Sequence, residues 1–323
     1  MIRKLLVGMV CIVLSASASA AAPMVKTQAP GFYRMMLGDF EITALNDGVV
    51  SMPQVFPGVS TDEIHARLAE RYLSDPVGMS FNAFLINTGN TLVLVDTGSG
   101  ELADSLGWHG AGHLLDNLRA AGYRPEQIDE IYVTHAHPDH VGGLMLGGQR
   151  AFAHAIVRAA RSEVEIYTDP QKMAAVLADA ADKEGATLRM QRIRNLFQPY
   201  IEAGMFRSFD EDGALAAGVR ALATPGHTRG HTCYVVESRG QTLIVIGDLI
   251  HNAEVQFPHP WAAAASDFDP KAAISHRNQV FELAAKEGDW IAGAHLSFPG
   301  LGHIRGGRGT YLWIPANYEI PKS

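Results

Sequence analysis

The sequence predicts an α/β fold in which helices cover β-sheets and a polar site lies at one rim. Strand-like apolar stretches alternate with helical patterns through both halves of the chain, and clusters of His and Asp follow the ends of strands. No low-complexity linker separates the halves, and 323 residues that are 47% hydrophobic provide a sizeable core. We therefore expect a single domain over residues 22–323.

The first 21 residues are expected to be a secretory signal rather than part of the fold. Arg3 and Lys4 precede an apolar run over 5–14, and small residues over 15–20 follow, as at a signal-peptidase site. A membrane anchor is the alternative, but the run is shorter than the roughly 20 residues of a spanning helix. The sequence thus predicts a periplasmic or secreted protein that leaves the membrane after cleavage near Ala20.

Composition excludes some functions. The formal net charge is −8, with no basic stripe, which argues against a nucleic-acid partner. Cys11 lies within the predicted signal, so Cys233 has no cysteine to pair with. The apolar neighbours of Cys233 favour a buried thiol over a nucleophile.

The first half begins with an expected irregular lead over 22–37. Further along we expect a strand starting at 40–45, a hairpin of 80–87 and 91–96, a helix near 114–118 stopped by Gly122, a strand over 130–134, and a helical stretch over 170–185. The second half repeats the pattern. Expected there are strands over 219–223, 233–237, 242–247 and 290–292, and a helix from Asp269-Pro270 to about Lys286.

The strongest chemical motif is the segment that directly follows the strand over 130–134. It places His135, His137, Asp139 and His140 within six residues. In an extended loop His135 and His137 point the same way, whereas the chain must turn at Pro138. Asp139 and His140 would then face a second position. Imidazole and carboxylate groups suit Zn²⁺, and also Fe, Mn or Co, so the motif predicts metal binding.

Three later motifs are each weak alone. Residues 224–231 hold His227 and His231 in a glycine-containing turn, Asp248 ends an apolar strand, and His295 follows the last predicted strand. An isolated Asp at such a place is more often a cap or turn residue.

Taken together, these motifs resemble the metallo-β-lactamase superfamily: HxHxDH, a GHTxGH turn, an Asp about twenty residues on, and a final His. The resemblance implies an αββα four-layer sandwich, an α/β fold of two similar halves, with two divalent metal ions between the sheet edges. It implies no ligand role for His231. The implied metal ligands are His135, His137 and His227 for one ion, Asp139, His140 and His295 for the other, and Asp248 bridging both.

Another element of the family, Val95-Asp96-Thr97-Gly98, implies that Asp96 orients a ligand loop by hydrogen bonds. Two cations roughly 3.5–4 Å apart lower the pKa of a bridging water and polarise the substrate. The resulting hydroxide attacks carbon or phosphorus. Asp139 is expected to move a proton to the leaving group as well.

Within the superfamily, segments 31–45, 140–145 and 294–304 resemble the methyl parathion hydrolases. That resemblance implies a secreted dizinc homodimer that hydrolyses organophosphate triesters, with relatives that open lactones and cleave aryl esters. The stretch around Met190 lacks the family's expected Phe, and Gly107-Trp108-His109 also departs from the family. His251 replaces an apolar residue, which favours a lactone or ester substrate.

The remaining candidates for the substrate pocket are aromatic. They are Tyr167, Phe257, Trp261 and Phe298, with His251 at the cleft mouth. Two alternatives of the same fold are kept. A β-lactamase usually lacks the bridging Asp present here as Asp248. A glyoxalase-II-like thioesterase carries a helical C-terminal domain, which is not expected in the 28 residues after His295.

Overall fold

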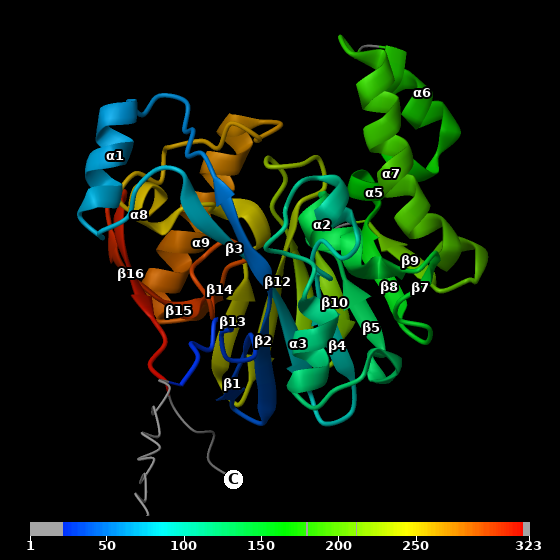
Figure 1. Cartoon of the computed structure of the whole chain (residues 1–323), viewed down its shortest axis with the longest axis horizontal. Helices are drawn as coiled ribbons and strands as arrows, with labels where there is room; N and C mark the ends of the chain where they lie inside the picture. The colour runs from blue at the N-terminus through cyan, green and yellow to red at the C-terminus, as the bar shows by residue number, and fades with distance from the viewer. Residues whose placement is uncertain (1–21, 179, 211, 319–323) are drawn as a thin grey trace, which may run out of the picture.

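The computed structural model describes residues 22–178, 180–210 and 212–318. The predicted signal, residues 1–21, lies outside the described residues. Two seven-stranded sheets form the centre of the molecule, and helices lie on both outer sides (Figure 1). Across the described ranges, no helix combines the length and the apolar character needed to cross a membrane.

The first sheet is built from the first half of the chain. In spatial order its strands are β1 Phe32–Leu37, β2 Phe40–Met52, β3 Val77–Asn87, β4 Leu92–Val95, β5 Glu130–Tyr132, β8 Ile156–Ala160 and β9 Phe206–Phe209. The pairs from β1 to β4 are antiparallel, and those from β4 to β9 are parallel. Parallel neighbours bring the carboxyl ends of β4, β5 and β8 to one rim.

The second sheet is built from the second half. Its strands, in spatial order, are β10 Gly213–Ala216, β11 Val219–Ala223, β12 Thr232–Ser238, β13 Gln241–Val245, β14 Trp290–Ala292, β15 Leu301–Gly307 and β16 Thr310–Pro315. Its one parallel pair, β13 and β14, places Val245 beside Ala292.

Helices and short elements complete the chain. They are α1 Thr61–Ala69, α2 Leu102–Ser105, α3 Leu114–Ala120, η1 Pro125–Gln127, α4 Pro138–Val141, η2 Gly142–Leu144, β6 Met145–Leu146, β7 Gln149–Arg150, α5 Arg161–Thr168, α6 Pro170–Ala178, α7 Lys183–Glu202, η3 Gly247–Leu249, α8 Ala253–Gln256 and α9 Pro270–Glu287.

Alternating side chains produce the layers. On β4, Leu92 and Leu94 join a cluster that contains α3 and α7 residues, whereas Val93 and Val95 face the second sheet. On β13, Leu243 and Val245 face the first sheet, whereas Ile244 packs with α9. Both strands are buried on two faces, because one face meets the other sheet and one meets helices. The predicted αββα sandwich is confirmed.

Most predicted elements are present, with two corrections. The lead segment is not irregular throughout, because Phe32–Leu37 forms β1 and pairs with β2 across a turn at Gly38. Pairing with β2 holds residues 32–37 in the strand conformation, and the sequence of that segment alone does not predict the pairing. The helical stretch over 170–185 is two helices, α6 and α7, of which α7 continues to Glu202.

Candidate metal centre

The predicted ligand loop leaves β5 and turns where Pro138 opens α4. His135 and His137 lie in the extended part, and Asp139 and His140 lie on the short helix. Proline suits the first helical position because no backbone N–H is needed there. The loop therefore presents its four side chains in two directions.

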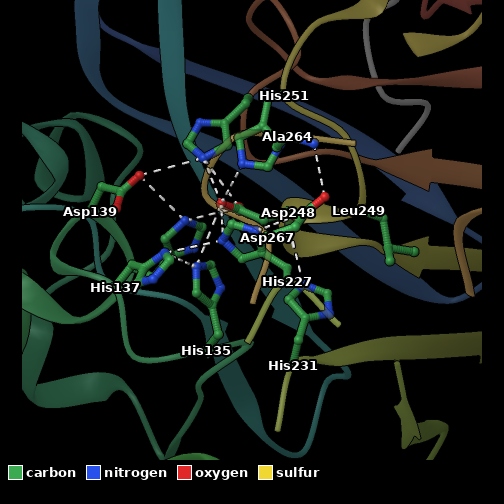
Figure 2. Close-up of polar contacts among 12 residues, drawn as sticks. His135, His137, Asp139, His227, His231, Asp248, Leu249, His251, Ala264 and Asp267 are labelled. Carbon is green, nitrogen blue, oxygen red and sulfur yellow. Dashed lines mark hydrogen bonds and ion pairs between the residues drawn. The ribbon is translucent and has the colours of Figure 1, made fainter. Parts of the chain in front are cut away.

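The second half supplies three more side chains, each from a different strand end. His227 lies in the loop between β11 and β12, Asp248 lies in η3 after β13, and His295 follows β14. All three reach the loop of the first half. Figure 2 shows the contacts of His135, His227 and His251 converging on Asp248.

One group of ligating atoms surrounds Nδ1 of His137. This nitrogen lies 3.0 Å from Nε2 of His135 and 3.1 Å from Nε2 of His227. Oδ2 of Asp248 lies 3.2 Å from Nε2 of His227 and 3.5 Å from Nε2 of His135. These four residues form one group able to hold a metal ion.

A second group lies on the other side of Asp248. Oδ1 of Asp248 is 3.1 Å from Nε2 of both His140 and His295, and Oδ2 of Asp139 is 3.4 Å from each of the same two nitrogens. Oδ2 of Asp248 is also 3.2 Å from Nε2 of His295. The carboxylate of Asp248 thus contacts both groups, as a bridging carboxylate would.

The spacing of these atoms fits small divalent ions. Donors about 2.0–2.1 Å from a tetrahedral zinc ion lie about 3.3 Å from one another, close to the separations found here. In addition, Nε2 of His140 and Oδ1 of Asp248 are buried without a hydrogen-bond partner among the described residues. Buried polar atoms are rarely left unpaired, and a cation would satisfy both. The residues therefore fit two metal ions.

Burial and neighbouring charged groups shift the pKa values of the ligands at the centre. Burial lowers the pKa of His137 to about 3, which leaves a neutral imidazole suited to a metal. Burial also opposes protonation of His227, but the carboxylates of Asp248 and Asp267 outweigh it and raise the pKa to about 9. For Asp248 itself, burial is outweighed by His295 and His140, which hold its pKa well below the usual range.

Asp96 supports the loop of the first half. Its carboxylate accepts hydrogen bonds from the backbone N–H and hydroxyl of Thr134, both at 2.8 Å, and lies 2.8 Å from Nδ1 of His140. The Asp96 backbone adopts a left-handed conformation with φ of 61°. These contacts orient His140 so that its Nε2 faces Asp139 and Asp248.

Two further acidic residues were not predicted from the sequence. The side chain of Asp267 is fully buried, lies 2.9 Å from Nδ1 of His227, and accepts a hydrogen bond from the Ala264 backbone. Glu163 accepts from the backbone N–H groups of Ala136 and Gly230, so it joins the two ligand loops. Neither lies in a motif, and only the tertiary structure buries them.

His231 takes a supporting role beneath the centre. Its Nε2 accepts a hydrogen bond from the backbone N–H of Asp248, and its Nδ1 lies 2.9 Å from the Thr224 hydroxyl. Gly247 is needed beside it, because φ is 48° and a Cβ there would lie 2.6 Å from Nε2 of His231. His231 therefore anchors the backbone that carries Asp248.

The predicted pocket residues separate in space. His251 is at the centre, with Nε2 3.2 Å from Oδ2 of Asp248 and its ring stacked on His295. Tyr167 lines a hollow of about 300 Å³ together with His137.

The other three aromatics do not lie with them. Phe257 is buried between the rings of Phe281 and Trp313, and it shares with Phe298 a different hollow lined by no predicted ligand. Trp261 is 46% exposed beside His259. The assignment of Phe257, Trp261 and Phe298 to the wall of the metal cleft stays a prediction.

Cys233 is buried as predicted. It is 0% exposed, and burial raises the pKa of its thiol to about 12.

The family model of the metallo-beta-lactamase superfamily matches residues 79–295. The chain belongs to the metallo-β-lactamase superfamily. The matched segment contains all seven predicted ligands, and this family together with two groups of ligating side chains is typical of a metal-dependent hydrolase.

Similar members of the superfamily include lactonases. Among solved structures, the hydrolase AbOPH in the beta lactamase superfamily is 36% identical, with a TM-score of 0.83 over 91% of this chain and 100% of that chain. AidC, a dizinc quorum-quenching lactonase, is 27% identical, with a TM-score of 0.80 over 90% of this chain and 99% of that chain.

Curated relatives match over a shorter part. An N-acyl homoserine lactonase of Bacillus cereus is 25% identical over 63% of this chain and 76% of its own length. An atrochrysone carboxyl ACP thioesterase of Passalora fulva is 26% identical over 65% of this chain. The chain spans about half of that thioesterase, 51%.

Proposed function

We propose that the protein is a two-metal hydrolase that cleaves lactones and aryl esters, and that it also accepts organophosphate triesters. One observation carries the proposal: seven ligating side chains converge in two groups, and the Asp248 carboxylate contacts both groups. The similarity to AidC, a dizinc lactonase, supports the choice of lactones. Zinc is the metal we propose, although the ligand types also suit Fe, Mn or Co.

When bound, two such ions would activate water and polarise the bond that is broken. The protein's own side chains hold and orient the reacting groups. Asp139 is the most exposed of the acidic ligands, with 13% of its side chain accessible, whereas Asp248 shows only 3%. An accessible carboxylate next to the centre can carry a proton at Oδ2 to a leaving alkoxide.

His251 adds a polar side chain beside the two groups of ligands. Its Nδ1 is buried and has no hydrogen-bond partner among the described residues. Its ring lies between His227 and His295, at centroid distances of 5.0 and 5.3 Å. A carbonyl-bearing substrate suits this polar surface better than a nitrophenyl ring does, which favours esters and lactones over parathion-like triesters.

The proposal is tested with the purified protein loaded with defined metals. We expect turnover of a lactone and an aryl ester, slower turnover of a phosphotriester, and little turnover of a cephalosporin or a thioester. A chelator should abolish turnover, and added Zn²⁺ should restore it. Two metal equivalents per chain are expected. A protein that holds at most one equivalent and keeps its activity in chelator would contradict the proposal.

The panel also separates the alternatives. Preference for the cephalosporin would indicate a β-lactamase, and preference for the thioester would indicate a thioesterase. The proton-transfer role is tested by Asp139→Asn: we expect slower turnover that is most marked for esters with poor leaving groups. Retention of both metals and full activity with all esters would remove that role.

We further propose that the mature protein is periplasmic or secreted and forms a homodimer. The basic, apolar and small-residue pattern of residues 1–21 supports export. The mass of the protein recovered from the periplasm should match cleavage near Ala20. Light scattering during size-exclusion chromatography should then give the mass of a dimer.

A further inference from the structure

A hollow beside the predicted ligand His137 combines apolar walls with arginine side chains. It has a volume of about 300 Å³ and lies between the ligand loop and the helices α5, α6 and α7. Figure 1 shows these helices together at one side of the molecule, with α6 and α7 extending beyond the sheets. A cavity of this size next to reactive groups can take a chain or ring of a small substrate. We call it the arginine pocket.

The charges in this pocket have one sign. Arg189 and Arg192 of α7 line it, and no Asp or Glu among the residues that the structure describes does. This is unusual in a chain with 34 acidic and 26 basic residues. A neighbouring hollow that opens beside β9 has Arg161 and Lys172 in its wall, but it also contains Glu165 and an aspartate. The charged side chains in the described wall of the arginine pocket are therefore both positive.

The polar side chains of the pocket have hydrogen-bond donors that no described residue uses. Arg192 is half-buried and makes no ion pair or hydrogen bond with any described residue. Arg189 has only a 3.6 Å contact with the exposed Asp182. The hydroxyl of Tyr167 also has no hydrogen-bond partner among the described residues, and burial raises its pKa, so it remains a donor. Most of the remaining wall is apolar, including Met190.

From this arrangement we infer that the substrate carries a carboxylate, which binds Arg192 while the ester or lactone bond lies beside His137. An apolar spacer between the two groups would contact the wall that includes Met190. The guanidinium of Arg192 donates two parallel hydrogen bonds to a carboxylate, and the hydroxyl of Tyr167 donates a third. This inference rests on the proposed function, because it names the class of ester or lactone that the same centre acts on.

The first experiment compares two matched esters. Both are para-nitrophenyl esters of suberic acid; in one the far end is the free carboxylate, and in the other it is the carboxamide. With the metal-loaded protein we expect a higher kcat/KM for the carboxylate. The variant Arg192→Gln should lower that value by about 10- to 100-fold, mainly through KM, and change the carboxamide value by less than about twofold.

The matched control is Arg194→Gln. Arg194 lies on the same helix but outside the wall of the pocket, so both esters should react as in the unmodified protein. Equal rates for the two esters in the unmodified protein would overturn the inference. An equal loss for both esters in Arg192→Gln would do so as well, because it would indicate a structural role.

A binding measurement separates this inference from the proposed function. The mono-anilide of suberic acid and its carboxamide analogue resist hydrolysis, and their affinities are measured by calorimetry on the metal-loaded protein. We expect tighter binding of the carboxylate, lost in Arg192→Gln and kept in Arg194→Gln. If the esters are not turned over but this difference is present, the proposed function fails and the pocket assignment holds. If turnover is found without any difference, only the pocket assignment fails.

Discussion

The two halves of the molecule contribute to one centre in different ways. The first half supplies its four side chains from one loop, residues 135–140, whose geometry is set by a short stretch of backbone. The second half supplies His227, Asp248 and His295 from three separate strand ends. Sheet pairing positions two of them: Val245 pairs with Ala292, so Asp248 and His295 are each three residues beyond paired positions.

One side of the centre therefore depends on local structure, and the other depends on a whole sheet. Each side also has its own supporting carboxylate, Asp96 for His140 and Asp267 for His227. Glu163 joins the two ligand loops. Substitutions at these carboxylates should therefore affect the two sides of the centre unequally.

The largest effect is expected where the two sides meet. Asp248→Asn replaces a carboxylate that contacts histidines of both groups, so we expect less than one metal equivalent per chain and a loss of activity on the order of 1000-fold. Metal content is measured by mass spectrometry beside the kinetic assay. Asp116→Asn, an exposed position, should retain both metals. Two tightly held equivalents in Asp248→Asn would show that the bridge is not needed.

A smaller, unequal effect is expected at the supporting carboxylates. Asp96→Asn and Asp267→Asn should each weaken metal affinity by about 10- to 100-fold, measured by competition with a chelator. We expect Asp96→Asn to have the larger effect, because Asp96 has three polar contacts in the ligand loop, whereas the Asp267 carboxylate has two at hydrogen-bond distance. The reverse order would mean that the sheet side limits affinity.

Stability should respond to loss of the connection between the loops. Glu163→Ala leaves the buried N–H groups of Ala136 and Gly230 without acceptors, at about 1–3 kcal/mol each. We therefore expect the free energy of unfolding to fall by about 2–6 kcal/mol in denaturant titrations. Glu165→Ala on the same helix removes only a surface ion pair with Lys172 and should change it by less than about 1 kcal/mol. Similar values for the two variants would argue against a connecting role.

The smallest expected effect is a lack of reaction at Cys233 in the second sheet. Burial raises the pKa of this thiol to about 12, so little reactive thiolate is present in the folded protein near pH 8. Alkylation by iodoacetamide should be at least about 100-fold slower than in denaturant. Fast labelling of the folded protein would show that the second sheet opens locally, in contrast to a stable first sheet.

The same contrast explains how much could be predicted from the sequence. The loop of the first half was predictable because its donors are neighbours in the chain and directly follow a strand. His227, Asp248 and His295 are isolated in the sequence, and they were assigned by resemblance to a family. Asp267 and Glu163 were missed because their burial arises from packing between distant segments. The stacking of Phe257 on Phe281 and Trp313 likewise has no local signature in the sequence.

The metal ligands are spread from residue 135 to residue 295, so the stability of the folded protein also depends on the metal supply. A chain that has unfolded cannot gather these side chains, so an ion held by them favours the folded form alone. At a free ion concentration about 100 times the dissociation constant, the gain is roughly 2.7 kcal/mol. The lifetime of the protein against proteases would then rise and fall with the supply of the divalent metal ion, even where no substrate is present.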